Sequence, residues 1–236
     1  MAVQNTLQKA KATAMIEFTA GNETVKISPT QVRDYLVSGD KEKVTMQEIA
    51  MFINLCKFQH LNPWLREAYC IKYGNEPATI VTGKDAFTKR AQRNPKYRGN
   101  QAGVIVLKES GDIENRIGSM VLPNEDLVGG WAKVYVEGYT EPVEISVGFE
   151  EYAARKKDGT LNAQWTKKPG TMIRKVALVQ AIREAFPDDF SGMYSQEEVD
   201  VGEVVLPEAP VEPEAHGNED NIVDAVTLPV EDDPLG

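Results

Sequence analysis

An apolar residue stands at every second position on both sides of Gly21-Asn22, near the start of the chain. This spacing is typical of two paired strands that each bury one face, and a glycine beside an asparagine suits the turn between them. We therefore predict a β-hairpin whose buried positions are Ile16, Phe18, Val25 and Ile27.

Two helices are predicted to follow, because two capping boxes come next. Ser28-Pro29-Thr30-Gln31 combines an N-cap serine, a proline at the first helical position and a glutamine at the capping-box position, and Gly39 ends this segment near Val37. The second box is Thr45-Met46-Gln47-Glu48. Its helix should stop before Asn62-Pro63 and bury Ile49, Phe52, Ile53 and Cys56, which recur at helical spacing.

The middle of the chain, to about residue 147, reads mostly as strands separated by Gly, Asn and Asp turns. One helix, Lys84–Arg93, interrupts them, and two more are predicted at Phe149–Lys157 and Met172–Phe186. Strands flanked by helices at both ends favour an α+β domain, with a mostly antiparallel sheet covered by helices on one face. The predicted strands are Ala68–Tyr73, Thr79–Thr82, Gly103–Lys108, Arg116–Leu122, Trp131–Glu137 and Glu144–Val147.

The formal net charge of −10 conceals two parts of opposite sign. Arg183 is the last basic residue, so residues 1–183 hold 26 basic and 20 acidic residues, and the rest of the chain holds 16 acidic ones. A basic body predicts a polyanionic partner. The acidic end could be a solubilising tail, a docking segment or an internal competitor for that partner.

Residues 200–236 contain five prolines and eleven acidic residues, and no aromatic residue follows Tyr194. Such a composition cannot bury enough apolar surface to offset the entropy of folding. We therefore predict a folded domain over residues 1–199 and a disordered acidic tail over residues 200–236.

The helix predicted at Met172–Phe186 is apolar at ten of its fifteen positions, which indicates burial on most sides. The basic side chains of such a helix must extend to solvent at its edge, pair with nearby acids, or line a groove that binds a polyanion. Two lysines and a candidate N-cap, Thr171, precede the helix, where free N–H groups attract phosphate. Basic residues beside an aromatic residue suit single-stranded nucleic acid, because charge binds the phosphates and the aromatic ring stacks on bases. The predicted DNA contacts in this segment are Trp165, Lys167, Lys168, Arg174, Lys175 and Arg183.

A second basic segment runs from Gly83 to Arg98, with six basic residues, one acid and two aromatic residues. This segment begins where a predicted strand ends, so the N-terminus of its helix is a second candidate anion-binding site. A solvated helix face is the alternative interpretation. The residues that we add to the predicted DNA contacts from this segment are Lys84, Lys89 and Arg90.

Enzymatic sites are not predicted. Gly83-Lys84 lacks the glycine spacing of a Walker A loop, and Asp85 stands where that loop needs Ser or Thr. The two histidines support no metal or triad constellation, and the two cysteines, Cys56 and Cys70, read as small core residues in a reducing cytosol. No apolar run approaches the ~18 residues that a membrane span requires.

Two separated segments carry a family resemblance: Leu61-Asn62-Pro63-Trp64-Leu65-Arg66-Glu67-Ala68-Tyr69 and Trp165-x6-Met172-Ile173-Arg174-Lys175-x-Ala177. The second continues into Arg183-x-Ala185-Phe186 and Gly192-Met193-Tyr194. In this order, over roughly residues 29–198, the chain resembles the Bet (Red-beta) branch of the RecT-like single-strand annealing proteins, which are phage recombination proteins. The N-P-W turn and the R-x-A-F…G-x-Y ending are the most specific parts of the match.

Proteins of this kind bind single-stranded DNA left by a 5′–3′ exonuclease, anneal it to a complementary strand without ATP, and assemble into rings or helical filaments. The resemblance therefore implies a DNA recombination protein without cofactor or catalytic centre in the cytoplasm of a bacterial host, with residues 1–199 as the annealing and oligomerisation domain. The implied partners are single-stranded DNA, the annealed duplex intermediate, further copies of the chain, a phage exonuclease and the host single-strand-binding protein. A protein that protects single strands without annealing them, and a divalent-metal nuclease, remain alternatives.

The resemblance also assigns residues. Arg66, Arg174 and Arg183 match basic positions of the family and Trp165 matches its tryptophan, so we place the DNA in a groove between the sheet and the Met172–Phe186 helix. Gly170, Thr171 and Val176 depart from basic positions of the family, and Lys167, Lys168 and Lys175 could compensate. The family's C-terminal helical domain, which engages the exonuclease, has no counterpart in the acidic tail.

Overall fold

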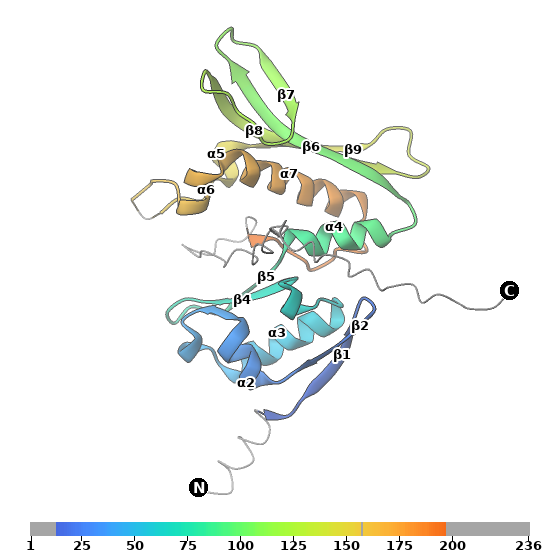
Figure 1. Cartoon of the computed structure of the whole chain (residues 1–236), viewed down its shortest axis with the longest axis vertical. Coiled ribbons are helices and arrows are strands. Elements are labelled where there is room, and N and C mark those ends of the chain that lie inside the picture. The colour runs from blue at the N-terminus through green and yellow to red at the C-terminus, as the bar shows by residue number, and fades with distance from the viewer. Residues whose placement is uncertain (1–12, 157, 197–236) are drawn as a thin grey trace, which may run out of the picture. The chain divides into compact units, whose positions relative to one another are not determined.

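The computed structural model describes residues 13–156 and 158–196, all within one of the two units of the chain, Met1–Leu206 (Figure 1). The predicted tail at residues 200–236 lies outside the described residues. The described part is an α+β fold with a two-stranded, a three-stranded and a four-stranded sheet, the last packed against a long helix.

The first half of the described chain confirms the predicted hairpin and both capping boxes. The hairpin is antiparallel and pairs Phe18 with Val25. In the first box the Ser28 Oγ accepts a hydrogen bond from the Gln31 N–H, and in the second the Thr45 Oγ1 accepts one from the Glu48 N–H. The elements are β1 (Ile16–Ala20), β2 (Glu23–Ile27), α2 (Pro29–Gln31), a π-helical turn (Val32–Leu36), a 3-10 turn (Lys41–Lys43) and α3 (Met46–Phe58).

The three-stranded sheet has the order β3-β4-β5. Its strands are β3 (Val37–Gly39), β4 (Ala68–Lys72) and β5 (Thr79–Thr82), and a 3-10 turn, Pro63–Leu65, precedes β4. Strand β3 is parallel to β4, whereas the sequence predicted a helix up to Val37 and no strand there. Val37 pairs with Cys70, a residue 33 positions later, so local sequence cannot specify this contact.

An ion pair between a buried lysine and a partly buried glutamate joins α3 to this sheet. The Lys72 Nζ donates to the Glu48 Oε1 at 2.7 Å and to the Glu76 carbonyl at 2.7 Å, and the Lys72 residue is only 4% exposed. Burial raises the pKa of the Glu48 carboxyl, but hydrogen bonds from Lys72 and from the N–H groups of Thr45 and Ala78 outweigh burial and lower that pKa to about 2. Glu48 thus caps its own helix and also anchors the strand.

The four-stranded sheet is antiparallel throughout and has the order β7-β6-β8-β9. Figure 1 shows α7 lying across one of its faces. A Cβ at Gly130 would lie 2.6 Å from the Ile173 carbonyl oxygen, so only glycine permits this approach of strand and helix. The elements are α4 (Lys84–Arg93), β6 (Tyr97–Lys108), β7 (Ile113–Ile117), β8 (Glu125–Val136), β9 (Val143–Gly148), α5 (Phe149–Tyr152), α6 (Ala163–Lys167) and α7 (Pro169–Ala185).

Four predicted elements are wrong in extent, and one helix was missed. Strands β6 and β8 begin at Tyr97 and Glu125, six residues before the predicted starts at Gly103 and Trp131. The strand predicted at Arg116–Leu122 is Ile113–Ile117, because Gly118, with a φ of 91°, turns the chain out of the strand. The helix predicted at Phe149–Lys157 ends at Tyr152, after which Arg155 forms a β-bridge with Leu161. Helix α6 lies in a segment that was expected to be a loop.

One hydrophobic core runs through both halves of the described chain and includes residues from the hairpin, from α3, from α4, from the four-stranded sheet and from α7. Cys56 and Cys70 are buried in it as free thiols, as predicted. Burial raises the pKa of both thiols to about 12, so neither is a reactive nucleophile near neutral pH.

Candidate nucleic-acid interface

Helix α7 carries the basic residues that the sequence singled out, and its two arginines lie on different sides. The Arg174 Nε donates to the Ala102 carbonyl of β6 at 3.1 Å, so this side chain lies against the sheet. Arg183 comes nine residues later, which at ~100° per residue is about half a turn around the helix. Its guanidinium lies over the ring of Tyr194, 4.8 Å from the centroid. The two arginines therefore do not form one wall, and a groove between the sheet and α7 is wrong because helix and sheet pack directly there.

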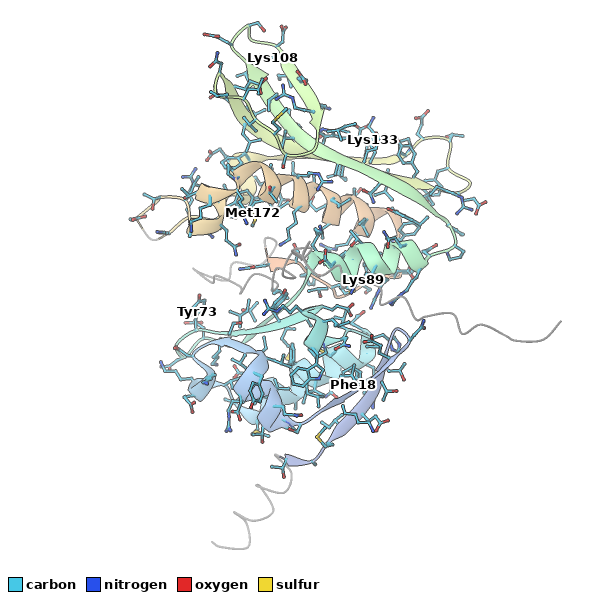
Figure 2. The ribbon with its side chains drawn as sticks, viewed as in Figure 1. Phe18, Tyr73, Lys89, Lys108, Lys133 and Met172 are labelled. Carbon is cyan, nitrogen blue, oxygen red and sulfur yellow. The ribbon has the colours of Figure 1, made fainter. Side chains whose placement is uncertain are left out.

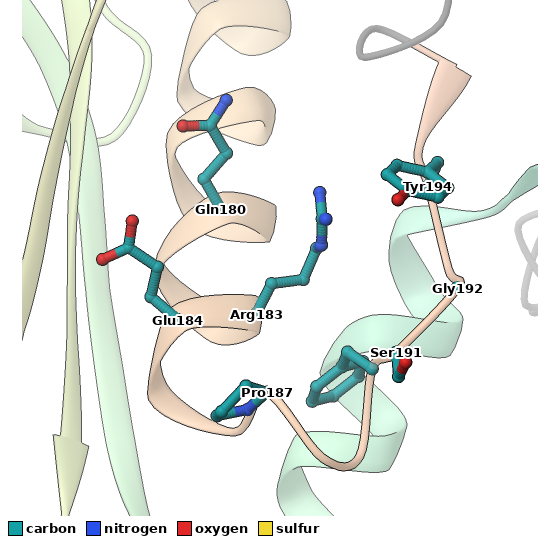
Figure 3. A pocket seen from close by; sticks show the side chains of 8 residues that line it. Gln180, Arg183, Glu184, Pro187, Ser191, Gly192 and Tyr194 are labelled. Carbon is teal, nitrogen blue, oxygen red and sulfur yellow. The ribbon is translucent and has the colours of Figure 1, made fainter.

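The face of α7 that carries Arg183 borders a surface hollow of about 550 Å³. Figure 3 shows Arg183 extending from the helix toward the segment that bears Tyr194, with Gln180 one turn earlier. The residues that line the hollow are Gln180, Arg183, Glu184, Pro187, Phe190, Ser191, Gly192 and Tyr194.

The outer wall of this hollow, residues 187–194, is held by contacts to three other parts of the chain. Phe190 stacks on Phe87 of α4, with ring centroids 5.6 Å apart. The Gln59 Nε2, just after α3, donates to the Ser191 carbonyl at 2.8 Å, and the Thr82 N–H at the end of β5 donates to the Tyr194 carbonyl at 2.8 Å. Since these partners are dispersed along the chain, only the tertiary structure places Tyr194 opposite Arg183.

Arg90 has a structural role in this wall. Its Nη1 donates to the Gln59 Oε1 at 3.0 Å and to the Asp189 carbonyl at 2.7 Å, and its Nη2 donates to the Gln59 carbonyl. Burial lowers the pKa of the Arg90 guanidinium. These internal contacts engage its donors, which favours a role in positioning residues 187–194 over the predicted phosphate contact.

The backbone of Arg66, just before β4, lies against Gly83, the residue that precedes α4. Arg66 adopts a left-handed conformation with a φ of 57°, and a Cβ at Gly83 would lie 2.7 Å from its carbonyl oxygen. Lys84 is the first residue of α4 and pairs with Asp85 at 3.5 Å. Further along, the Lys89 Nζ binds the buried Glu67 carboxylate at 2.9 Å, so part of its charge is neutralised inside the protein.

The predicted stacking role of Trp165 is contradicted by its position. Trp165 is only 1% exposed and packs edge-on against Phe149, with ring centroids 5.6 Å apart. Lys167 and Lys168 are exposed beside it, at the end of α6 and the start of α7. Thr171 lies inside the first turn of α7, where Lys168 occupies the N-cap position, so the predicted N-cap is also wrong.

The four-stranded sheet offers little positive charge. Residues 97–148 hold four basic and eight acidic residues, and each basic residue has an acidic partner. Figure 2 labels Lys108 and Lys133 on this sheet and Lys89 on α4. The pairs are Arg98–Glu137 at 2.5 Å, Lys108–Glu114 at 2.7 Å, Arg116–Glu125 at 2.6 Å and Lys133–Glu144 at 3.1 Å. On charge grounds the surface of α4 and α7 therefore suits an anionic strand better than the surface of the sheet does.

Comparison with known proteins identifies the family of this chain. The sequence model of the RecT family matches residues 22–212. The chain belongs to the RecT family. A protein of Ureaplasma parvum serovar 3, named "Uncharacterized protein UU154", is 28% identical over 168 residues, which cover 70% of this chain and 67% of that protein.

Membership of the RecT family implies annealing of single-stranded DNA in recombination. The family match does not distinguish the Red-beta branch, so that finer resemblance stays a prediction. Over residues 13–156 and 158–196, every helix is too short or too polar to cross a membrane.

The residue that sequence reasoning missed in this RecT protein is Tyr194. It was recognised only as the end of the G-x-Y motif, and no contact was assigned to it. Gly192 of the same motif has a φ of 73°, which favours glycine and turns the chain before Tyr194. The sequence signal that pointed to Tyr194 was the short separation between Arg183 and the G-x-Y motif.

Replacing Trp165 by leucine is expected to lower the free energy of unfolding by about 2–4 kcal/mol, because it leaves a cavity beside Phe149. Affinity for a single-stranded oligonucleotide, measured by fluorescence anisotropy on the folded variant, should stay within about twofold of wild type. A stable variant with clearly weakened binding would restore the stacking interpretation.

Proposed function

We propose that this RecT protein anneals complementary single strands without ATP, and that it binds one strand over the side of α7 that faces away from the sheet. Family membership is the observation that carries the annealing function. The position of the strand is supported by the Arg183–Tyr194 pair at the hollow, with Lys175 on the same helix, Lys84 at the start of α4 and Arg66 just before β4.

The chemistry of the hollow fits a single strand. Arg183 supplies a guanidinium that suits phosphate, and Tyr194, 49% exposed, supplies an aromatic face on which a base can stack. Both contacts are independent of base identity, as an annealing protein requires. Lys167 and Lys168 extend the positive charge past the N-terminus of α7.

Annealing needs no chemical fuel, because pairing releases roughly 1.4 kcal/mol per base-pair step from duplex stacking. The protein has only to reduce the repulsion between phosphates and align the two strands. Neighbouring copies on one strand would make binding cooperative and sensitive to salt. Assembly into rings or filaments, a phage exonuclease and a host single-strand-binding protein as partners remain parts of this proposal.

A fluorescence assay with two complementary labelled oligonucleotides tests the function. We expect the purified protein to accelerate annealing at least tenfold over the spontaneous rate, equally with and without ATP. Slower renaturation in its presence would identify a single-strand protector instead. Incubating labelled DNA with the protein and Mg²⁺ or Mn²⁺ checks for cleavage, which would identify a nuclease.

A further inference from the structure

The side chain of Gln59 joins the end of α3 to the outer wall of the hollow. Gln59 follows the last residue of α3 and occupies its C-cap position. Its Nε2 donates to the Ser191 carbonyl at 2.8 Å, and its Oε1 accepts a hydrogen bond from the Arg90 Nη1 at 3.0 Å. Both ends of this amide are therefore engaged, and the bond to Ser191 joins residues that are 132 positions apart in the sequence.

Arg90 ties the same end of α3 to a second point of the wall. Its Nη2 donates to the Gln59 carbonyl, where a guanidinium is favoured because it faces the negative end of the helix dipole. Its Nη1 also donates to the Asp189 carbonyl at 2.7 Å, and the Asn94 Nδ2 donates to the Asp189 Oδ2 at 2.6 Å. The wall is thus held at Asp189 from α4 and its C-cap, and at Ser191 by Gln59.

The Ser191 carbonyl belongs to the peptide group that leads into Gly192. Gly192 has a φ of 73°, and glycine populates positive and negative φ about equally, so the backbone alone does not select one orientation of this peptide. The hydrogen bond from the Gln59 Nε2 selects it. A Cβ at Gly192 would lie 3.8 Å from that nitrogen, so the amide lies directly beside the turn. Figure 3 shows Ser191 and Gly192 on the segment that leads to Tyr194.

We propose that Gln59 is a positioning residue for single-stranded DNA: its amide fixes the peptide between Ser191 and Gly192, and thereby holds Tyr194 opposite Arg183. This inference rests on the proposed function of the Arg183–Tyr194 pair. Without the amide, Gly192 can take either sign of φ, and the Tyr194 ring lies at the guanidinium in only a fraction of the molecules. The apparent affinity for DNA then falls in proportion to that fraction.

Replacing Gln59 by methionine tests the proposal. Gln59→Met keeps the length of the side chain and a high helix propensity, but removes the donor to Ser191 and the acceptor for Arg90. We expect the affinity for a labelled single-stranded oligonucleotide, measured by anisotropy, to fall about 3–10-fold, which corresponds to a competent fraction of about a third to a tenth. Gln101→Met is the matched control, because Gln101 is exposed on β6 and does not line the hollow. Its affinity should stay within about twofold of wild type.

Tyr194→Ala provides a second background that separates positioning from a general loss of structure. This change alone should weaken binding, because it removes the aromatic face on which a base can stack. Adding Gln59→Met to it should cause no further loss, since the ring that Gln59 positions is absent, so the two effects are non-additive. An equal fold loss from Gln59→Met in both backgrounds would overturn the proposal. Weakened binding by Tyr194→Ala but not by Gln59→Met would overturn it as well.

Hydrogen exchange measured by mass spectrometry gives a readout that does not depend on DNA. In the free Gln59→Met protein we expect peptides that cover residues 187–194 to exchange about tenfold faster, whereas peptides from β6 and β8 keep their rates. Faster exchange with unchanged DNA affinity, in Gln59→Met and Tyr194→Ala alike, would keep the role of Gln59 in the wall and refute the proposed function of this surface. Unchanged exchange would refute the role of Gln59, whatever the DNA affinity.

Discussion

Replacing Arg183 by alanine is expected to lower the affinity for single-stranded DNA at least tenfold and to reduce the annealing rate in parallel. The change removes a charge-assisted phosphate contact, worth about 1.5–3 kcal/mol, and the cation–π contact that supports Tyr194. Anisotropy with a labelled oligonucleotide measures the first effect, and the two-strand fluorescence assay measures the second.

Three variants make this result specific. Arg183→Lys should recover part of the affinity, since it keeps the charge without the planar guanidinium. Arg33→Ala removes an exposed arginine that pairs with Asp34, and should leave binding within about twofold. Arg174→Ala should act mainly on stability, because its donor bonds to the Ala102 carbonyl. Unchanged annealing by a folded Arg183→Ala protein would contradict the proposed binding surface.

Replacing Lys72 by alanine is expected to lower the free energy of unfolding by about 3–5 kcal/mol, the usual cost of removing one partner of a buried ion pair. The Glu48 carboxylate would keep its bonds from Thr45 and Ala78 but lose its cationic partner. The Glu76 carbonyl would lose its bond from the Lys72 ammonium as well. Urea unfolding followed by circular dichroism measures the effect.

Two controls accompany this measurement. Glu48→Gln with Lys72→Met removes both charges, and should cost less than Lys72→Ala because no buried charge is left unpaired. Lys26→Ala breaks an exposed pair with Glu17 and should change stability by less than about 1 kcal/mol. If Lys72→Ala and Lys26→Ala lower the free energy of unfolding equally, burial of the Lys72–Glu48 pair does not add to its effect on stability.

The elements that were predicted best depend on short stretches of sequence. The hairpin around Gly21-Asn22, both capping boxes, β5 and α4 occupy the predicted positions, because alternation, caps and turn residues act within a few positions of one another. Strand β3 was missed because its pairing with β4 comes from a distant segment. The predicted β7 was shifted because the turn at Gly118 was not recognised.

By itself, the sequence determined the distribution of charge, the α+β class and the motifs that match the RecT family. These properties are sums over residues or local spacings, so no packing is needed to recognise them. The tertiary structure alone decided which basic residues share a surface. It buried Trp165 against Phe149, turned Arg174 to the sheet, and placed Tyr194 opposite Arg183. The physical reason is that a helix buried on most sides leaves only a narrow face to solvent, and contacts from distant segments determine which face that is.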